Sequence, residues 1–411
     1  MMNSLISIAL FFTCSFLFAQ ENLIEKLLRQ NPQYFSTVLS NIDTFEVQII
    51  YTQINRDKNN YPKFTTYKFN VDPKKYFYPA STVKLPLAVL SLEKINKLKI
   101  SGLKKFTPLK IDSVREGQTS VTIDTSSVNG LPSIANYVKK VLLVSDNDAY
   151  NRLYEFLGQE YINEQLHKKG FKDVKIIHRF VPFSIEQNRY TNPITFYDGE
   201  KILYQQPEQY NNKTYSFDLK GLLKGIGYLD SKDSLIKKPF DFSNKNYISL
   251  ETLHNILKAI IFPETQKNKF NLTNEDYKFL YKYMSMLPRE SKKPGYDSTH
   301  HDSYVKYFLF GDSKEKIPDN IRIFNKVGLA YGYLTDVAYI VDFKNKVEFM
   351  LSAVIHVNKN KIYNDGIYEY EQIGLPFLSK LGKVVYENEL NRNKKFLPDL
   401  SKFKIDYTKL D

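Results

Sequence analysis

Cysteine, tryptophan and histidine are scarce in this chain of 411 residues, with one cysteine, no tryptophan and 6 histidines. The single cysteine, Cys14, lies in an apolar block near the N-terminus, so no internal disulfide can form. Beyond that block there is no thiol nucleophile and no cysteine metal ligand. His300 and His301 are adjacent, but they lack a third ligand at zinc-site spacing. We therefore expect a reaction that uses neither a metal nor a cofactor.

Long apolar runs are also missing, with one exception at residues 5–18 (LISIALFFTCSFLF). This block is shorter than the roughly 20 residues that a membrane-spanning helix needs. It ends at Ala19, before the first charge at Glu21, and predicts a cleavable signal over residues 1–19. Thr13 before Cys14 is larger than a lipidation site favours, and residues 16–18 (FLF) after it are bulky rather than small or acidic, which disfavours lipidation. Export without disulfides fits a bacterial periplasm or cell surface, with no integral membrane span.

The composition is that of a folded protein, with 42% hydrophobic and 25% charged residues. The net charge of +13 is spread along the chain and forms no concentrated basic run. No nucleic-acid motif accompanies it, so nucleic acid is not expected as a partner. A lysine-rich surface facing an anionic envelope accounts for the charge, and we expect a monomer.

The chain is predicted to form one domain, residues 21–411, with strands near both ends and helices between them. β-branched and aromatic residues indicate strands at 44–55 and 63–71, and alternating apolar residues indicate strands at 333–343 and 346–357. Helical periodicity indicates helices at 22–29, 81–96, 250–262, 275–287 and 366–381, and one or two helices at 134–157. The fold class is thus α/β (α+β): a sandwich whose mostly antiparallel sheet comes from both termini and is covered by helices. A helical subdomain is inserted at about 98–320, with polar surface insertions at about 204–246 and 291–319.

The first candidate for chemistry is the S-x-x-K sequence of Ser81 and Lys84, at the start of a predicted apolar helix. The same pattern recurs elsewhere, so the helix after it is what distinguishes this copy. Residues three apart share one face of a helix, so the amine can reach the hydroxyl and take its proton. Amides at the helix N-terminus can stabilise developing negative charge. The alternative is that Ser81 is only a helix cap.

Two further short motifs follow in the chain. Ser145 and Asn147 belong to an S-D-N triplet that occurs once, and Lys326 and Gly328 belong to K-V-G, which precedes an alternating strand. Alone, the triplet could be a capping or buried polar network. Lys326 could be an exposed lysine at a sheet edge.

The three motifs in this order resemble those of the class A β-lactamases and related penicillin-recognising serine hydrolases. The resemblance covers roughly residues 45–381 outside the polar insertions. Further matches to the family pattern lie after the second and third motifs, at Asn151, Leu153, Leu157, Gly332, Thr335, Asp336 and Ala338.

The resemblance implies catalytic roles for Ser81, Lys84 and Ser145. Ser81 would be the acylated nucleophile, Lys84 its base or proton relay, and Ser145 the group that passes a proton to the leaving nitrogen.

The resemblance also implies a substrate-binding set. Asn147 would hold Lys84 and a substrate amide. Lys326 and Gly328 of the K-V-G segment would bind the substrate, with Lys326 facing its carboxylate. The backbone N–H groups of Ser81 and Leu329 would form the oxyanion hole.

Two positions depart from the family pattern. Val327 stands where the family has a threonine or serine whose hydroxyl helps to hold the substrate carboxylate. Val181 stands where the family has its deacylating glutamate, two residues after Arg179. Glu186 follows shortly and could replace that glutamate if the loop turned it inward, although a lone loop carboxylate is usually solvated.

These observations leave three hypotheses. The first is an exported serine hydrolase that forms an acyl-enzyme on Ser81 and hydrolyses a β-lactam or a related amide or ester. The second is a penicillin-binding protein or DD-peptidase-like enzyme with slow deacylation, acting on a substrate that resembles a wall-peptide terminus. The third is a non-catalytic wall-binding protein on the same fold, which the joint presence of all three motifs disfavours.

Overall fold

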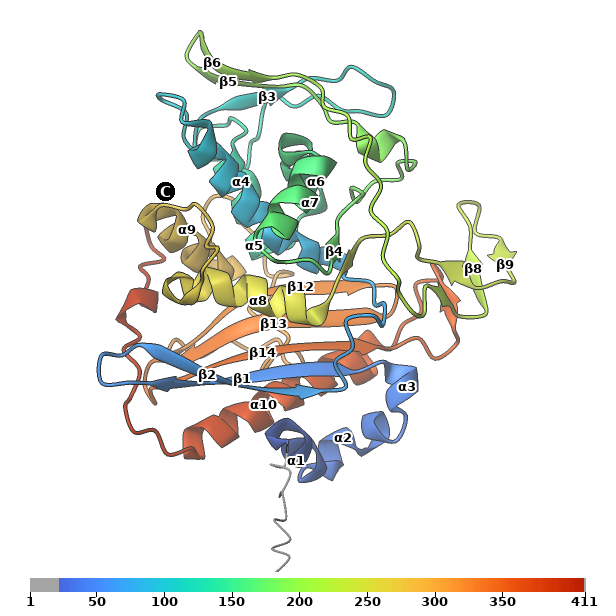
Figure 1. The fold of residues 1–411 in the computed structure, drawn as a ribbon, viewed down its shortest axis with the longest axis vertical. Coiled ribbons are helices and arrows are strands. Elements are labelled where there is room, and N and C mark those ends of the chain that lie inside the picture. The colour runs from blue at the N-terminus through green and yellow to red at the C-terminus, as the bar shows by residue number, and fades with distance from the viewer. Residues whose placement is uncertain (1–21, 410–411) are drawn as a thin grey trace, which may run out of the picture.

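A five-stranded antiparallel sheet forms the centre of the molecule, which a computed structural model describes over residues 22–409 (Figure 1). The predicted signal and Cys14 lie outside the described residues. The strand order is β12-β13-β14-β1-β2. The strands are β1 (Gln48–Arg56), β2 (Pro62–Phe69), β12 (Ile321–Ala330), β13 (Tyr333–Asp342) and β14 (Val347–His356). Because β1 pairs with β14, the sheet joins both ends of the chain, and the predicted fold class is confirmed.

Alternating side chains of the sheet enter two separate cores. In β1, Ile49 and Tyr51 belong to the core under α1 (Leu23–Arg29), α2 (Pro32–Leu39) and α10 (Leu375–Asn391). Ile50 and Ile54 of the same strand enter the larger core on the opposite face. Figure 1 shows α1, α2 and α10 on one side of the sheet and the remaining long helices on the other.

The larger core lies under the inserted part of the chain. Its helices are α4 (Lys84–Leu98), which follows the 3-10 turn η1 (Ala80–Val83), α5 (Ile134–Leu143), α6 (Asn147–Leu157), α7 (Gln159–Lys168), α8 (Leu250–Ile261) and α9 (Asn274–Ser285). Polar caps fix two of the helix starts: Ser249 accepts from Thr252 N–H before α8, and Thr273 forms a capping box with Asp276 before α9.

Short strands lie between these helices, where a helical subdomain was predicted. They are β3 (Leu109–Ile111), β4 (Val174–Lys175), β5 (Ile194–Asp198), β6 (Lys201–Gln206), β7 (Leu223–Lys224), β8 (Gly227–Leu229), β9 (Leu235–Ile236), β10 (Phe240–Asp241) and β11 (Tyr247–Ile248). The polar stretch 204–246 forms several of them, and β8 and β9 project from the body in Figure 1, close to β15 (Ile362–Tyr363).

Three predicted segments need correction. The strand predicted from residue 44 begins at Gln48, because α3 (Ile42–Phe45) precedes it and Glu46 has φ 45°. The helix predicted from residue 366 begins with a π-helical turn at Tyr370–Gly374 and continues as α10 from Leu375. The stretch 291–319 does not lie wholly on the surface. Phe308, Leu309 and Ile317 are buried in the smaller core, although the surrounding lysines give the segment a polar composition.

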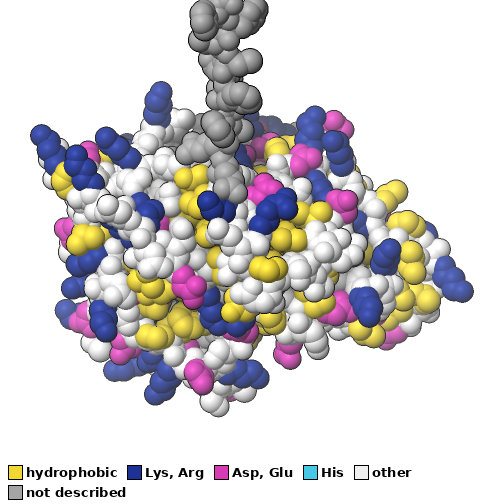
Figure 2. Space-filling model, turned by 90° about the horizontal axis from the view of Figure 1, so that it is seen from below, with side chains coloured by type: hydrophobic (Ala, Val, Ile, Leu, Met, Phe, Trp, Pro, Cys, Tyr) yellow, Lys and Arg dark blue, Asp and Glu magenta, His cyan; other side chains and the backbone are white. Residues whose placement is uncertain are grey.

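The positive charge is dispersed over the face below the sheet. Figure 2 shows lysine and arginine side chains there between acidic and apolar ones, without a single large basic patch. Within residues 22–409, no helix is both long and apolar enough to cross a membrane.

Candidate active site

The candidate nucleophile lies in a strained turn that leads into a buried helix. Ala80, immediately before Ser81, has φ 46°, a left-handed conformation that residues with a side chain seldom adopt. Thr82 fixes the turn, since its Oγ1 and its backbone N–H both donate to Pro79 O, at 2.6 and 3.1 Å. The turn places Ser81 on the wall of a cleft, as the functional reading of the motif requires.

Lys84 contacts Ser81 directly and is held by groups of the second motif. Its Nζ lies 2.8 Å from Ser81 Oγ and 2.6 Å from Asn147 Oδ1. The Ser145 carbonyl oxygen lies at 2.5 Å and Ser145 Oγ at 3.3 Å from the same nitrogen. Burial lowers the pKa of Lys84 to about 7. A neutral amine here can donate to Asn147 and the Ser145 carbonyl while its lone pair accepts the proton of Ser81.

The S-D-N triplet forms the start of α6 and the link from α5. Asp146 is the cap of α6, and its Oδ1 accepts from Ala149 N–H at 2.7 Å. Ser145, just before this cap, has φ 61° and thus also lies in the left-handed region. The link turns both Ser145 and Asn147 toward Lys84, which lies about 60 residues earlier in the chain.

Lys326 completes the cluster from the edge strand β12. Its Nζ lies 2.8 Å from Ser145 Oγ and 2.9 Å from Val327 O. Burial, and then repulsion from Lys84, hold the pKa of Lys326 well below its ordinary value. The Ser145 hydroxyl therefore lies between two lysine nitrogens, which is a suitable place for a group that relays a proton.

Gly328 allows β12 to lie directly against the turn that holds Ser81. A Cβ atom on Gly328 would lie 2.5 Å from Pro79 O and 3.1 Å from Thr82 Cγ2.

We expect Gly328→Ala to lower the free energy of unfolding by about 1–3 kcal/mol, because backbone must move to admit the methyl group. Urea denaturation measures this change. Gly295→Ala, whose nearest neighbour is at 3.3 Å, is the control, and equal stability of both variants would contradict the packing argument.

The cleft beside Ser81 is a cavity of about 410 Å³. Asn147 and Leu329 are among the residues that line it, and Leu329 is 40% exposed. Aromatic side chains that sequence reasoning did not identify form much of the remaining wall: Tyr78, Phe180, Tyr331 and Tyr368. Tyr78 adjoins the first motif and Tyr331 follows the third, so proximity to the motifs was the available signal for those two.

No carboxylate replaces the deacylating glutamate in the cleft. Val181 is 38% exposed and lines a different cavity. Phe180 faces the cleft instead, with its ring centroid 5.0 Å from Lys84 Nζ. The Glu186 side chain is 61% exposed and lies 3.8 Å from Arg189, so it is not turned inward. Of the residues that line the cleft, none is Asp or Glu.

The Val327 side chain points away from Ser81 and Lys84. It is 3% exposed and packs in the smaller core below the sheet, whereas Lys326 contacts Ser145 on the opposite face. In this structure the side chain of residue 327 therefore does not line the cleft.

No group of three His, Cys, Asp or Glu side chains within residues 22–409 is placed to hold a metal ion.

Comparison with known proteins yields one family and many structures. The model of the Beta-lactamase enzyme family matches residues 21–388. No curated protein matches the chain. A class A β-lactamase from Clostridium kluyveri DSM 555 is 15% identical, with 87% of this chain and 98% of that one covered and a TM-score of 0.47. A β-lactamase from Xanthomonas campestris pv. campestris is 12% identical, with 89% and 97% covered and a TM-score of 0.48. Because the family match spans most of its length, this chain belongs to the Beta-lactamase enzyme family.

Proposed function

We propose that the protein is a serine hydrolase that is acylated on Ser81 by a β-lactam or a related amide or ester, and that it deacylates slowly. The observation that carries this proposal is the 2.8 Å contact between Lys84 Nζ and Ser81 Oγ, made by a buried amine whose pKa is about 7. Such an amine is a base at neutral pH, and the hydroxyl lies within its reach.

Acylation would run through the groups already in contact. Ser81 Oγ attacks the carbonyl carbon as its proton moves to Lys84, while the backbone N–H groups of Ser81 and Leu329 stabilise the oxyanion. Ser145 donates its proton to the leaving nitrogen and regains one from a neighbouring lysine. When the C–N bond breaks, the acyl group stays on Ser81.

Deacylation lacks a carboxylate base in the cleft. Water must be deprotonated to attack the ester, and the part of the cleft nearest Lys84 carries the ring of Phe180 rather than a carboxylate. This arrangement supports slow deacylation, as in a penicillin-binding or DD-peptidase-like enzyme, over rapid β-lactam turnover. We also propose export to the periplasm or cell surface, on the strength of the apolar block at residues 5–18.

The acylation rate is expected to rise with pH and to level off above about 7. The neutral amine is the active form of Lys84, and burial lowers its pKa to about 7, so protonation below that value removes the base. Adduct formation with a penicillin, quenched at intervals and measured at a series of pH values, tests this. A rate that is independent of pH across this range would contradict the role of Lys84.

A chromogenic cephalosporin tests the proposed function as a whole. We expect a burst of about one product molecule per protein molecule, followed by slow steady-state release, because acylation outpaces deacylation. Sustained turnover without a burst would contradict slow deacylation. Absence of any reaction with β-lactams would contradict the proposed substrate class.

A further inference from the structure

A second cavity, of about 380 Å³, lies next to the catalytic cleft. One side is formed by the loop that carries Arg179 and Val181, and the other by residues 213–215 and 243–245 of the polar insertion. None of the residues that line it is Asp or Glu, whereas several are basic: Lys175, His178, Arg179, Arg189, Lys213 and Lys245.

Three of the basic side chains already have carboxylate partners outside the cavity wall. Arg179 Nε lies 3.5 Å from Glu155, Arg189 Nε lies 3.8 Å from Glu186, and Lys213 Nζ lies 2.8 Å from Glu160. These pairs leave Lys175 and Lys245 as the cations to be balanced.

Lys175 and Lys245 have no ion pair within residues 22–409. Lys175 is 7% exposed, and its Nζ donates to the backbone oxygen of Ser243 at 2.8 Å. Lys245 is half-buried and lies over aromatic rings. Burial lowers the pKa of both lysines. Nearby, His178 Nε2 is buried with no hydrogen-bond partner. Desolvated cations without a counter-ion are unfavourable, and an anion in the cavity would remove that penalty.

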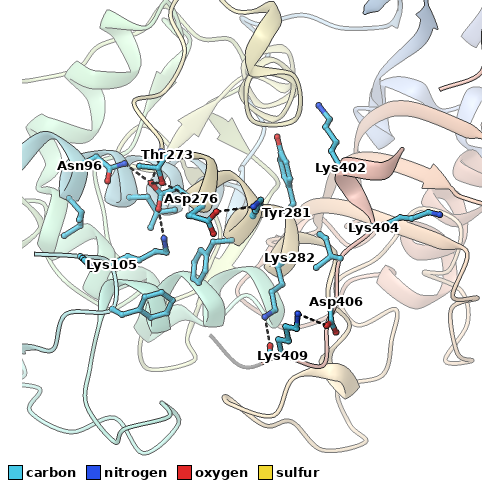
Figure 3. A pocket seen from close by; sticks show the side chains of 18 of the residues that line it. Asn96, Lys105, Thr273, Asp276, Tyr281, Lys282, Lys402, Lys404, Asp406 and Lys409 are labelled. Carbon is cyan, nitrogen blue, oxygen red and sulfur yellow. Dashed lines mark hydrogen bonds and ion pairs between the residues drawn. The ribbon is translucent and has the colours of Figure 1, made fainter. Parts of the chain in front are cut away.

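Another cavity, of about 880 Å³, provides a contrast (Figure 3). It lies at the C-terminal half of α4 and is also rich in lysine. There, carboxylates in the wall pair with three of the lysines: Lys105 with Asp276 at 2.8 Å, Lys278 with Glu275 at 3.1 Å, and Lys409 with Asp406 at 3.6 Å. Lys104 and Lys404 of that wall have no ion pair within residues 22–409, but both side chains are exposed. The smaller cavity differs because its unpaired lysines are buried (Lys175) or half-buried (Lys245).

A layer of aromatic side chains separates the 380 Å³ cavity from the Ser81 cleft. His178 stacks on Tyr78 at a centroid distance of 6.4 Å, and Lys245 Nζ lies 5.8 Å from the centroid of Tyr331. Both tyrosines line the catalytic cleft. A group held by Lys245 would thus lie beside a substrate bound at Ser81.

We propose that Lys175 and Lys245 form an anion subsite that binds a carboxylate or phosphate group of the substrate beside the Ser81 cleft. The inference rests on the proposed function in taking Ser81 as the reacting residue, and it narrows the substrate class to amides or esters that carry an additional acidic group.

Calorimetric titration of the protein with inorganic phosphate, and separately with glutarate, tests the subsite without any acylation. We expect saturable binding of at least one anion, and the two titrations distinguish phosphate from carboxylate recognition. Binding should weaken about tenfold in Lys245→Gln, since one charged hydrogen bond is lost. Lys175→Gln is a second test at the other lysine of the subsite. The matched control is Lys238→Gln, an exposed lysine of the same insertion. No saturable binding, or equal weakening in the control, would overturn the subsite.

Acylation rates test whether the anion belongs to the substrate. A penicillin with a second carboxylate on its side chain is compared with one whose side chain is neutral. The ratio of the two rates should fall about tenfold in Lys245→Gln and stay constant in Lys238→Gln. A constant ratio in both would mean that the cavity binds a separate small anion, which overturns the substrate assignment. If neither penicillin acylates the protein, the proposed function fails, while the titrations still decide the subsite.

Discussion

Replacing Lys84 by methionine is expected to slow acylation of Ser81 by a penicillin about 10²- to 10⁴-fold, the usual contribution of a positioned general base. Methionine fills much of the volume of the lysine side chain but cannot accept the Ser81 proton. The pH dependence centred near 7 should vanish in the same variant, because it reports the titration of this amine. Rapid-quench mass spectrometry measures both effects.

Lys94 offers a matched control on the same helix. It too is buried, and burial lowers its pKa to about 7. Its Nζ, however, donates to Phe156 O at 2.5 Å and to Gln206 Oε1 at 2.7 Å, away from Ser81. Lys94→Met should reduce stability and leave the acylation rate of the folded protein near that of the unmodified chain. If both variants slowed acylation equally, the acylation rate would depend on having a buried lysine in α4 and not on the contact between Lys84 and Ser81.

Replacing Phe180 by glutamate is expected to accelerate deacylation by about 10²-fold or more, because it puts a carboxylate where water could be activated. The ring of Phe180 lines the cleft and lies 5.0 Å from Lys84 Nζ, so a side chain at this position reaches the acylated serine. The new negative charge should also raise the pKa of Lys84 and thereby slow acylation at neutral pH. Decay of the preformed adduct, followed after removal of free penicillin, isolates the deacylation step.

Two variants separate basicity from shape in this experiment. Phe180→Gln has nearly the same size as Phe180→Glu but no base, and it should leave the adduct long-lived. Val181→Glu places the carboxylate at the position that the motif spacing indicates, but Val181 lines the neighbouring cavity, so little acceleration is expected. Rapid deacylation in Val181→Glu and not in Phe180→Glu would contradict the arrangement of the loop.

The contact between Ser81 and Lys84 could be predicted from their spacing in the sequence alone. Ser81 and Lys84 are one helical turn apart, so their contact follows from local geometry. Ser145, Asn147 and Lys326 reach the same point from segments far along the chain. Nothing local predicts that convergence, and only the order of the three motifs and the family resemblance indicated it.

The loop beside the cleft shows where such reasoning ends. Motif spacing assigned the position of the missing base to Val181, but the neighbouring residue faces Lys84. The loop conformation depends on side chains from elsewhere: Asn151 Oδ1 accepts from Phe180 N–H, and Asn188 Oδ1 accepts from Arg179 N–H, both at 2.8 Å. Such contacts decide which of two adjacent side chains faces the cleft, and they leave no periodic signal in the sequence.

The central sheet could be predicted because apolar residues alternate regularly along its strands. Strands β13 and β14 are joined by a short turn and alternate strongly, and their predicted bounds agree with the structure to within about a residue. The segments that were misplaced have irregular backbone. Glu46 takes a left-handed conformation that delays β1, and the buried residues around Phe308 lie in a stretch without helix or strand.

The measurement that tests the central claim most directly is a time course of intact mass for the protein and for Ser81→Ala, each mixed with a penicillin. The account predicts that the unmodified protein gains the mass of one penicillin, on the peptide that contains Ser81, and that this adduct persists long after it has formed. Ser81→Ala should stay folded and gain no mass. An adduct on Ser81→Ala equal to that on the unmodified protein would contradict the assignment of Ser81 as the acylated nucleophile, and no adduct on either would contradict acylation by a penicillin.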